Sequence, residues 1–364
     1  MKILMCFNQM IGFAYELYSI ILFLFSQGKC YNIERKVKAA FKVSTFSEKH
    51  VEKERGIKMA DLKPADIQRV KAMGFLKNTT NDGFSMRVLT KNGVLTAAQW
   101  KNLSEVADKW GNGTLSLTTR LTVEIPAIQY EDIEAVQNYI AQEGMVTGGT
   151  GDKVRPVVAC KGTVCKFGNC DTQAIAEKIH DRFFVGYENV KLPHKFKIAV
   201  GGCPNNCVKP DLNDFGLMGV HYSEFDKELC RGCKKCAIEL NCPMGAASVV
   251  DGKMTVNQEI CNHCGRCVGK CYFHAVKPGT KAFRIFIGGR WGKKTRHGSM
   301  LPGVYTEEEA LDMIEKTMLL FREKGQPKER LAALLDRVGE EAFFDELLHG
   351  DVLTRKEEIL KDGN

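Results

Sequence analysis

Eight cysteines between residues 230 and 271 are the feature that most constrains the fold of this chain. They form two near-repeats, CRGCKKCAIELNC and CNHCGRCVGKC, each with three cysteines at C-x2-C-x2-C spacing and a fourth soon after. A disulfide scaffold belongs to short secreted chains, and this chain has 364 residues. The runs suit coordination of a metal by thiolates, with iron–sulfur clusters as the favoured interpretation and zinc as the alternative.

The two runs resemble a bacterial-type ferredoxin module that holds two [4Fe–4S] clusters. In such a module the fourth cysteine of each run binds the other cluster. The expected ligands are Cys230, Cys233, Cys236 and Cys271 for one cluster, and Cys242, Cys261, Cys264 and Cys267 for the other. The first run departs from the usual pattern because five residues, not three, separate its third and fourth cysteines. The module would pass single electrons, and clusters on this scale indicate a reducing cytoplasm, typical of an anaerobe.

A second cysteine-rich segment, from Cys160 to Cys207, combines thiols with basic residues. It contains ACKGTVCKFGNCDT and KLPHKFKIAVGGCPNNC. The alternation in LPHKFKIAVGG predicts a strand with Lys195 and Lys197 on one face and His194 on the other. Thiolates bind iron and closely spaced lysines bind an oxyanion, so the segment indicates redox chemistry on a small anion. The plainer alternative for the two lysines is a solvated strand edge.

The charge pattern argues against nucleic acid and favours an anionic substrate or an acidic redox partner. The net charge is +8, and the basic residues are spread along the chain without a Lys/Arg block or arginine–aromatic interleaving. Gly148, Gly149 and Gly151 match neither a phosphate-binding loop nor a dinucleotide fingerprint. They predict a turn before Arg155.

Residues 1–58 differ from the rest of the chain. Leu17 to Phe25 is an apolar run, shorter than the roughly 20 residues that span a bilayer, and no A-x-A-like cleavage site follows it. From Met59 onward the sequence is smoothly globular. Three interpretations stay open: an artefactual leader before a true start at Met59, a membrane-surface anchor, and an ordinary extension.

From Phe84 onward hydrophobic periodicity predicts an α+β fold. FSMRVLT alternates as a strand, and residues 95–110 have helical spacing. TLSLTTRLTVEIP is expected to be a second strand that Pro126 ends, and residues 130–143 a second amphipathic helix. The apolar stripes of these elements are assigned to the core.

Two arginines fall within the predicted strands. Arg87 is in FSMRVLT, and Arg120 is in LTTR, where a charge needs a partner if its face is covered. A further helix is expected to start at the cap formed by Asp171 and Thr172, and to run to about Phe184.

Four separated motifs, GGCPNNC, LPHKFK, LTTR and IGGRWGKK, together resemble the sirohaem-dependent sulfite and nitrite reductase family. The likeness is greatest to the anaerobic, dissimilatory-type sulfite reductase subunits that carry an inserted two-cluster ferredoxin module. It covers about residues 70–345 and rests on several motifs, which makes it specific.

The resemblance implies a third [4Fe–4S] cluster, coupled to sirohaem. Family members hold this cubane on four cysteines, the last of which bridges to the sirohaem iron. The corresponding residues are Cys160, Cys165, Cys203 and Cys207, with Cys207 as the bridging thiolate. The first pair is spaced C-x4-C where many relatives have C-x5-C, so nearby Cys170 is an alternative ligand.

The resemblance also assigns residues around the substrate and the macrocycle. The substrate-side cations correspond to Arg120, Arg155, Lys195 and Lys197. They would offset the charge of sulfite in a dry site, and the lysines would pass protons as oxygens leave as water. Sirohaem carries eight carboxylates and needs many donors. The expected donors are Arg87, Arg290, Lys293 and Lys294, with the amides of Gly288, Gly289 and Gly292.

We therefore expect an α+β fold with a ferredoxin-like half and a sirohaem/[4Fe–4S] domain that a two-cluster ferredoxin module interrupts. The expected boundaries are 1–58 for the atypical leader, 59–145 for the half domain, 146–225 and 279–364 for the sirohaem domain with its C-terminal helices, and 226–278 for the insertion. Full-length assimilatory relatives contain two such halves and this chain has one, so a homo- or hetero-oligomer is expected.

The expected function is six-electron reduction of sulfite to sulfide, with electrons passing from a donor protein to the ferredoxin clusters, the cubane and sirohaem. The alternatives are reduction of nitrite to ammonia, and an iron–sulfur electron carrier that lacks sirohaem. The sequence contains no flavin or nicotinamide fingerprint, so the reductant is expected to reach this chain through another protein or a partner subunit.

Overall fold

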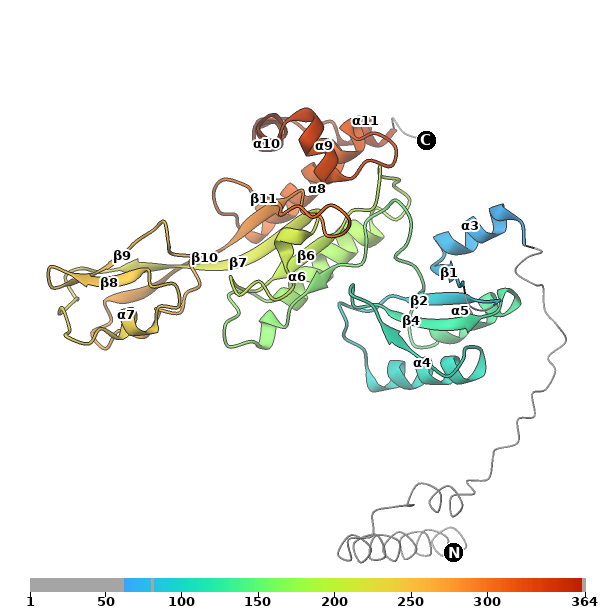
Figure 1. Cartoon of the computed structure of the whole chain (residues 1–364), viewed down its shortest axis with the longest axis horizontal. Coiled ribbons are helices and arrows are strands. Elements are labelled where there is room, and N and C mark those ends of the chain that lie inside the picture. The colour runs from blue at the N-terminus through green and yellow to red at the C-terminus, as the bar shows by residue number, and fades with distance from the viewer. Residues whose placement is uncertain (1–61, 80–81, 362–364) are drawn as a thin grey trace, which may run out of the picture. The chain divides into compact units, whose positions relative to one another are not determined.

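The computed structural model describes residues 62–79 and 82–361, all within one structural unit (Figure 1). The predictions for residues 1–58, including the apolar run from Leu17 to Phe25, lie outside the described residues. Within the described part of the chain, no helix is both long enough and apolar enough to cross a membrane.

The first folded part is a small α+β layer on a four-stranded antiparallel sheet. Its strands are β1 (Phe75–Lys77), β2 (Phe84–Val88), β3 (Ser116–Leu117) and β4 (Val123–Ile128), in the order β1-β2-β4-β3. Its helices are α3 (Pro64–Ala72), α4 (Ala97–Lys109) and α5 (Ile133–Ala141), the last preceded by a 3-10 turn, η2 (Tyr130–Asp132). The helices predicted over 95–110 and 130–143 are confirmed.

Side-chain alternation and capping explain why this layer forms. Alternate residues of β2, namely Phe84, Met86 and Val88, are fully buried. Helix α4 begins after Thr96, whose hydroxyl accepts a hydrogen bond from Gln99 N at 3.1 Å while the Gln99 side chain accepts one from Thr96 N at 3.0 Å. This capping box fixes the start of α4, and the apolar side of the helix joins the same core as the sheet.

The prediction of one strand over TLSLTTRLTVEIP is wrong, because the chain forms a hairpin there. β3 and β4 pair around a tight turn, in which Leu121 has a left-handed φ of 59°. Arg120 therefore lies in this turn and not in a strand. Pro126 also does not end the strand: β4 continues to Ile128, and a register shift against β2 accommodates the missing N–H.

The second folded part is a five-stranded mixed sheet in the order β11-β10-β7-β6-β5. Its strands are β5 (Val158–Ala159), β6 (Ile198–Gly201), β7 (Phe215–Phe225), β10 (Val276–Ile287) and β11 (Ser299–Met300). β5, β6 and β7 run parallel, whereas β10 is antiparallel to both β7 and β11. The parallel arrangement puts the loops that follow β5 and β6 at one edge of the sheet.

Helices share one large core with this sheet. They are α6 (Thr172–Ile179), α8 (Glu307–Lys324), α9 (Leu331–Val338), α10 (Glu340–His349) and α11 (Lys356–Lys361), with the short segments η3 (Gly162–Val164), η4 (His180–Val185) and η5 (Pro210–Leu212). The predicted cap of α6 is confirmed, since the Asp171 carboxylate accepts a hydrogen bond from Ala174 N at 3.1 Å. The π-helical η4 continues α6 past Phe184, where the sequence predicts the helix to end.

Residues 226–275 form a small unit between β7 and β10. It contains α7 (Ala237–Asn241) and a hairpin of β8 (Ala247–Val250) and β9 (Lys253–Val256), and Figure 1 shows it at the paired ends of β7 and β10. Asp226 N donates to Ala275 O at 2.9 Å, so the chain enters and leaves at neighbouring points. The unit has its own core, which includes Cys230, Cys236, Ile238 and Met254. The predicted domain boundaries stay predictions.

Candidate active site

Two parallel strands bring the central cysteines together. Cys160 follows β5 and Cys203 follows β6, so both lie at the same edge of the sheet. The sulfur of Cys160 accepts a hydrogen bond from Gly202 N at 3.2 Å. Burial raises the pKa of Cys203, and the neighbouring sulfurs of Cys160, Cys207 and Cys165 raise it further. All four cysteines predicted to hold the cubane therefore lie in one neighbourhood.

The glycine before Cys203 lets the two cysteine loops approach each other. A Cβ at Gly202 would lie 2.9 Å from Gly162 Cα and 3.3 Å from the sulfur of Cys160, so a larger residue would push the loops apart. Asn206, in the turn between Cys203 and the next cysteine, has a left-handed φ of 56°. Because of this close approach, the loops can surround a compact metal cluster with their thiolates.

Cys170 lies beside this set. Burial raises the pKa of its thiol to about 12, with a further contribution from Cys160 and Cys203. Its sulfur packs against the core of the sheet domain, and a Cβ at Gly219 would come within 2.9 Å of it. This packing against the core favours a structural role for Cys170 over metal ligation.

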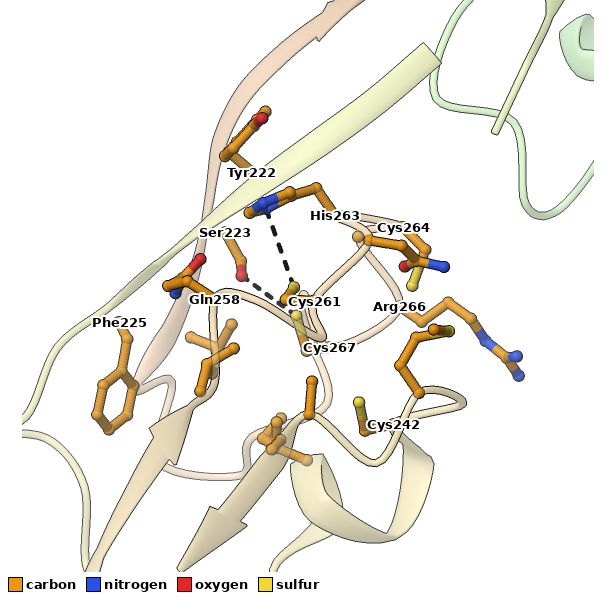
Figure 2. Close-up of a pocket in the computed structure, with 18 of the residues that line it drawn as sticks. Tyr222, Ser223, Phe225, Cys242, Gln258, Cys261, His263, Cys264, Arg266 and Cys267 are labelled. Atoms are coloured by element: carbon orange, nitrogen blue, oxygen red, sulfur yellow. Dashed lines mark hydrogen bonds between the residues drawn. The ribbon is translucent and has the colours of Figure 1, made fainter. Parts of the chain in front are cut away.

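The insertion gathers a second set of cysteines around a cavity of about 330 Å³ (Figure 2). The cavity lining includes Cys242, Cys261, Cys264 and Cys267. Burial raises the pKa of Cys261, and the sulfurs of the other three cysteines raise it further. Cys242 of the first run therefore lies with the second run, which agrees with the crossed ligand assignment that the resemblance to a two-cluster ferredoxin implies.

Backbone amides favour thiolates in the insertion. Burial opposes ionisation of Cys242, but hydrogen bonds from four amides bring its pKa below the ordinary value. These amides belong to Met244, Gly245, Ala246 and Ala247. Burial also opposes ionisation of Cys230, and its pKa is lowered by amides that include Met254 N, 3.4 Å from the sulfur. Such N–H donors hold and tune iron–sulfur clusters, so the donor set fits the predicted group.

The other expected ligands of the first cluster differ in exposure. Cys230 and Cys236 are buried, Cys271 is half-buried and Cys233 is exposed. Within the ranges that the structure describes, no group of three or more His, Cys, Asp or Glu side chains is arranged to hold a single metal ion. A cubane differs from a single ion, because each of its four irons takes one protein thiolate.

The predicted lysines lie on one side of the segment that leads into β6. Phe196 is fully buried in the core, while Lys195 and Lys197 on either side of it are half-buried. His194 is paired with Asp152, with Nδ1 3.1 Å from Oδ1. The two lysines therefore face away from the core.

Arg120 reaches the same region from the half domain. Its guanidinium donates to Pro156 O at 2.7 Å, to Ile198 O at 2.7 Å and to Asn213 Oδ1 at 2.9 Å. Burial lowers its pKa to about 10, although the nearby carboxylate of Asp214 opposes the shift. The sequence indicates that a covered charge at Arg120 needs a partner. Its partners are acceptors in the sheet domain, mostly backbone carbonyls.

Arg155 and Arg87 share one carbonyl. Gly149 O accepts hydrogen bonds from Arg155 Nη1 at 2.6 Å and from Arg87 Nη1 at 3.3 Å. Arg87 also pairs with Glu124 on the neighbouring strand, with Nε 2.9 Å from Oε1. Burial, followed by the charge of Arg87, lowers the pKa of Arg155 to about 10. The Nε of Arg155 is buried and has no hydrogen-bond partner among the described residues.

A fifth cation, Arg330, belongs to this group and escapes prediction from the sequence. Its Nη2 lies 2.9 Å from both carboxylate oxygens of Asp214, which is fully buried and also accepts from Lys197 N at 2.9 Å. The Nε of Arg330 is likewise buried and unpartnered in the described part of the chain. Arg330 stands at the start of α9, in a charged helical segment far along the chain, so no local pattern marks it.

These cations surround one buried carboxylate, that of Asp214. We call them the Asp214 cation cluster, which consists of Arg120, Arg155, Lys195, Lys197 and Arg330. Burial, together with the charges of Arg120 and Arg330, lowers the pKa of Lys197 to about 8. Burial and then Arg330 also lower the pKa of Lys195. Positive charge exceeds negative charge here, which is the condition for binding an anion.

The remaining predicted carboxylate binders lie in the loop between β10 and β11. Arg290 Nε donates to Lys294 O at 2.8 Å, and the side chains of Lys293 and Lys294 are exposed. Lys209 Nζ lies 5.9 Å from the centre of the Trp291 ring. The loop therefore lies beside the segment that follows Cys207.

Comparison with known proteins explains this combination. Residues 150–355 match the family described as nitrite and sulphite reductase 4Fe-4S domain, and residues 77–143 match the nitrite/sulfite reductase ferredoxin-like half domain. The chain belongs to the nitrite and sulfite reductase family. This is a family of oxidoreductases, so the family and the α+β class predicted from the sequence are confirmed, while the inserted ferredoxin module stays a prediction. The matched residues include the central cysteines and the Asp214 cation cluster.

Individual relatives agree with the family assignment. The chain is 32% identical over 251 residues to the coenzyme F420-dependent sulfite reductase of Methanocaldococcus jannaschii, covering 68% of this chain and 39% of that protein. It is 28% identical over 284 residues to one of the subunits of the anaerobic sulfite reductase of Salmonella typhimurium, covering 71% of this chain and 81% of that one. The solved structure of dissimilatory sulfite reductase I has the same fold, with a TM-score of 0.59 at 22% identity over 72% of this chain and 68% of that chain.

Proposed function

We propose that this chain is a sulfite reductase that reduces sulfite to sulfide with six electrons, at a sirohaem coupled to a [4Fe–4S] cluster. The observation that carries the proposal is the Asp214 cation cluster, four of whose five members lie in the same domain as the four neighbouring cysteines. Arg155 and Arg330 each hold a buried Nε without a partner among the described residues. This surplus of positive charge and of free donors fits an oxyanion together with the carboxylates of sirohaem.

The cysteines would hold the metal groups. The proposed cubane ligands are Cys160, Cys165, Cys203 and Cys207, with Cys207 as the thiolate shared with sirohaem. When bound, sirohaem would supply the iron that takes the sulfur of sulfite and passes electrons to it. Arg87 and Arg290, with Lys293 and Lys294, are the proposed partners of its carboxylates; of these, Arg87 is already tied to Glu124 and to Gly149 O.

The cations would bind the substrate and supply protons. Burial makes each charge in the Asp214 cation cluster more effective than it would be in water. Protons are needed because the oxygens of sulfite leave as water. Lys197, with a pKa of about 8, is protonated at neutral pH and gives up its proton more readily than an ordinary lysine. Lys195, whose pKa is also lowered, can serve in the same way.

Residues 226–278 would feed electrons to this site through two further [4Fe–4S] clusters. The neighbourhood of Cys242 with Cys261, Cys264 and Cys267, and the amides that stabilise the Cys242 and Cys230 thiolates, support this proposal. The whole chain would then carry three cubanes and one sirohaem. The proposed domains are those expected from the sequence, with the half domain at 59–145 and the sirohaem domain at 146–225 and 279–364.

We propose an oligomer in the cytoplasm. Lys197 precedes β6 and Cys203 follows it. The strand has four residues and is about 13 Å long, so it separates the lysines of one chain from the central cysteines of the same chain. A second copy or a related subunit that brings its cations to this cysteine edge would complete each site. Co-expression of Lys197→Ala and Cys207→Ser chains tests this arrangement: a shared site regains part of the activity in the mixed oligomer, whereas sites confined to single chains stay inactive.

Anaerobic purification from a host that makes sirohaem tests the function. The expected result is about twelve irons from three cubanes, sirohaem absorption bands that shift on addition of sulfite, and reduction of sulfite to sulfide by a small reductant. A preference for nitrite in competition would change the substrate and keep the chemistry. Iron without sirohaem bands would contradict the reductase and favour an electron carrier.

A further inference from the structure

The two cysteine runs of the insertion differ in what surrounds them. The second run, from Cys261 to Cys267, faces the rest of the chain. The His263 ring stacks on the Tyr222 ring with centroids 3.8 Å apart (Figure 2). In the backbone, His221 N donates to His263 O at 2.8 Å. The run is thus docked on β7, the long strand that belongs to the sirohaem domain.

The second run also touches the loop of the central cysteines. The Arg266 guanidinium lies 4.9 Å from the centre of the Phe167 ring, and Phe167 stands between Cys165 and Cys170. Gly219 of β7 packs against the Cys170 sulfur and the Gly202 backbone, and two residues later His221 packs against Gly265. A cluster on the second run would therefore lie on the side nearer to the central cubane, and we call it the inner cluster.

The first run has the opposite surroundings. Its intervening residues Arg231, Lys234 and Lys235 are all exposed, and so is Cys233 itself. None of the three basic side chains forms an ion pair with any residue that the structure describes. Glu239 is the single acidic residue between Cys230 and Cys242. The cluster bound by the first run, which we call the outer cluster, is therefore edged by an unpaired positive patch.

Two large apolar side chains of the insertion are also exposed. Tyr272, directly after the expected outer-cluster ligand Cys271, is 87% exposed, and Leu240, which follows the basic patch along the first run, is 72% exposed. Exposed aromatic and aliphatic side chains beside positive charges are the composition of a protein-binding surface rather than that of a small-ion site. A charged rim steers a partner of opposite sign and speeds its association.

We propose that the first run is the docking surface for an acidic one-electron carrier protein. Its core is the basic patch of Arg231, Lys234 and Lys235 around Cys233. When bound, the outer cluster would accept one electron at a time from the donor, which is itself oxidised by one electron each time. The contact of Arg266 with Phe167 joins the second run, which would hold most of the inner cluster, to the loop of the central cysteines. This proposal rests on the proposed function, because it requires both clusters of the insertion.

The test uses the full chain and a strongly acidic bacterial-type ferredoxin as the reductant. Stopped-flow absorbance gives the second-order rate of cluster reduction at several salt concentrations. The patch variant is Arg231→Gln/Lys234→Gln/Lys235→Gln, which removes charge without adding any. The matched control is Lys63→Gln/Lys71→Gln/Lys101→Gln, three exposed lysines of the half domain, which changes the net charge equally. Photoreduced deazaflavin, a small neutral reductant, reports cluster integrity.

The patch variant should be reduced by the ferredoxin at least about tenfold more slowly at low salt and should lose most of its salt dependence. The control variant should stay within about twofold of the parent protein, and reduction by deazaflavin should be the same for all three. Equal slowing of the patch and control variants would overturn the docking surface, and so would slower reduction of the patch variant by deazaflavin. A parent chain without clusters would overturn the proposed function as well, so the two failures are distinguishable.

Discussion

Arg330 Nη2 lies 2.9 Å from both carboxylate oxygens of Asp214, a carboxylate with no exposed surface. The same carboxylate accepts a hydrogen bond from Lys197 N. One ion pair therefore connects the start of α9 to the segment that presents the lysines to the proposed substrate. It also supplies the buried negative charge that offsets part of the Asp214 cation cluster.

Arg330→Gln should destabilise the protein. The substitution leaves the Asp214 carboxylate buried without its charged partner, and breaking a buried pair in this way costs about 3–5 kcal/mol. Thermal and urea denaturation of the apo protein measure the loss. The control is Lys91→Gln, because Lys91 and Glu177 form a pair that is mostly exposed and should be worth at most about 1 kcal/mol. Equal losses for the two variants would contradict a special role for Asp214.

Sulfite reduction should fall as the pH rises through about 8. Burial, with help from Arg120 and Arg330, lowers the pKa of Lys197 to about 8, so the side chain is a cation and a proton donor below that pH and neutral above it. Initial rates with a small reductant between about pH 6.5 and 9.5 give the profile. Lys197→Arg should lower the rate and remove this alkaline limb, since arginine stays protonated. An unchanged limb in Lys197→Arg would assign the titration to another group.

Cys207→Ser should remove the coupled sirohaem–cubane spectrum and spare the two clusters of the insertion. The prediction follows from the place of Cys207 in the central cysteine set. Visible absorption, EPR and iron content measure the outcome. Cys170→Ser is the matched control, because a thiol packed against the core of the sheet domain is expected to leave all iron in place. An unchanged visible spectrum in Cys207→Ser would rule out its bridging role.

Phe167→Ala should slow the passage of electrons from the insertion to the central cubane. Phe167 follows Cys165 by two residues and its ring contacts Arg266 of the second run, so its loss removes this contact between the two loops. Freeze-quench EPR after rapid reduction should show the insertion clusters reduced first and the central cubane several times later than in the parent protein. Lys270→Ala, at an exposed residue of the second run, is the control. Identical time courses would place the path elsewhere.

Local patterns in the sequence predict the cysteine sets and the lysine pair. The C-x2-C spacing, the alternation around Phe196 and the cap at Asp171 each depend on a few neighbouring residues. Tertiary packing does not change the local structure that these short patterns predict. The turn at Arg120 escapes prediction for a physical reason: Leu121 adopts a left-handed φ without the glycine or asparagine that normally marks such a turn. Arg330 escapes because only tertiary packing brings α9 to Asp214.

The paired ends of β7 and β10 make the insertion a separable cassette. Phe225 pairs with Val276, and Asp226 N donates to Ala275 O. The two strands therefore remain paired up to the residues where the insertion begins and ends. A short hairpin turn in place of residues 227–274 would join them without disturbing the sheet. Evolution can therefore exchange the proposed electron input of such a chain for another, or dispense with it, while the fold around the proposed anion site is inherited intact.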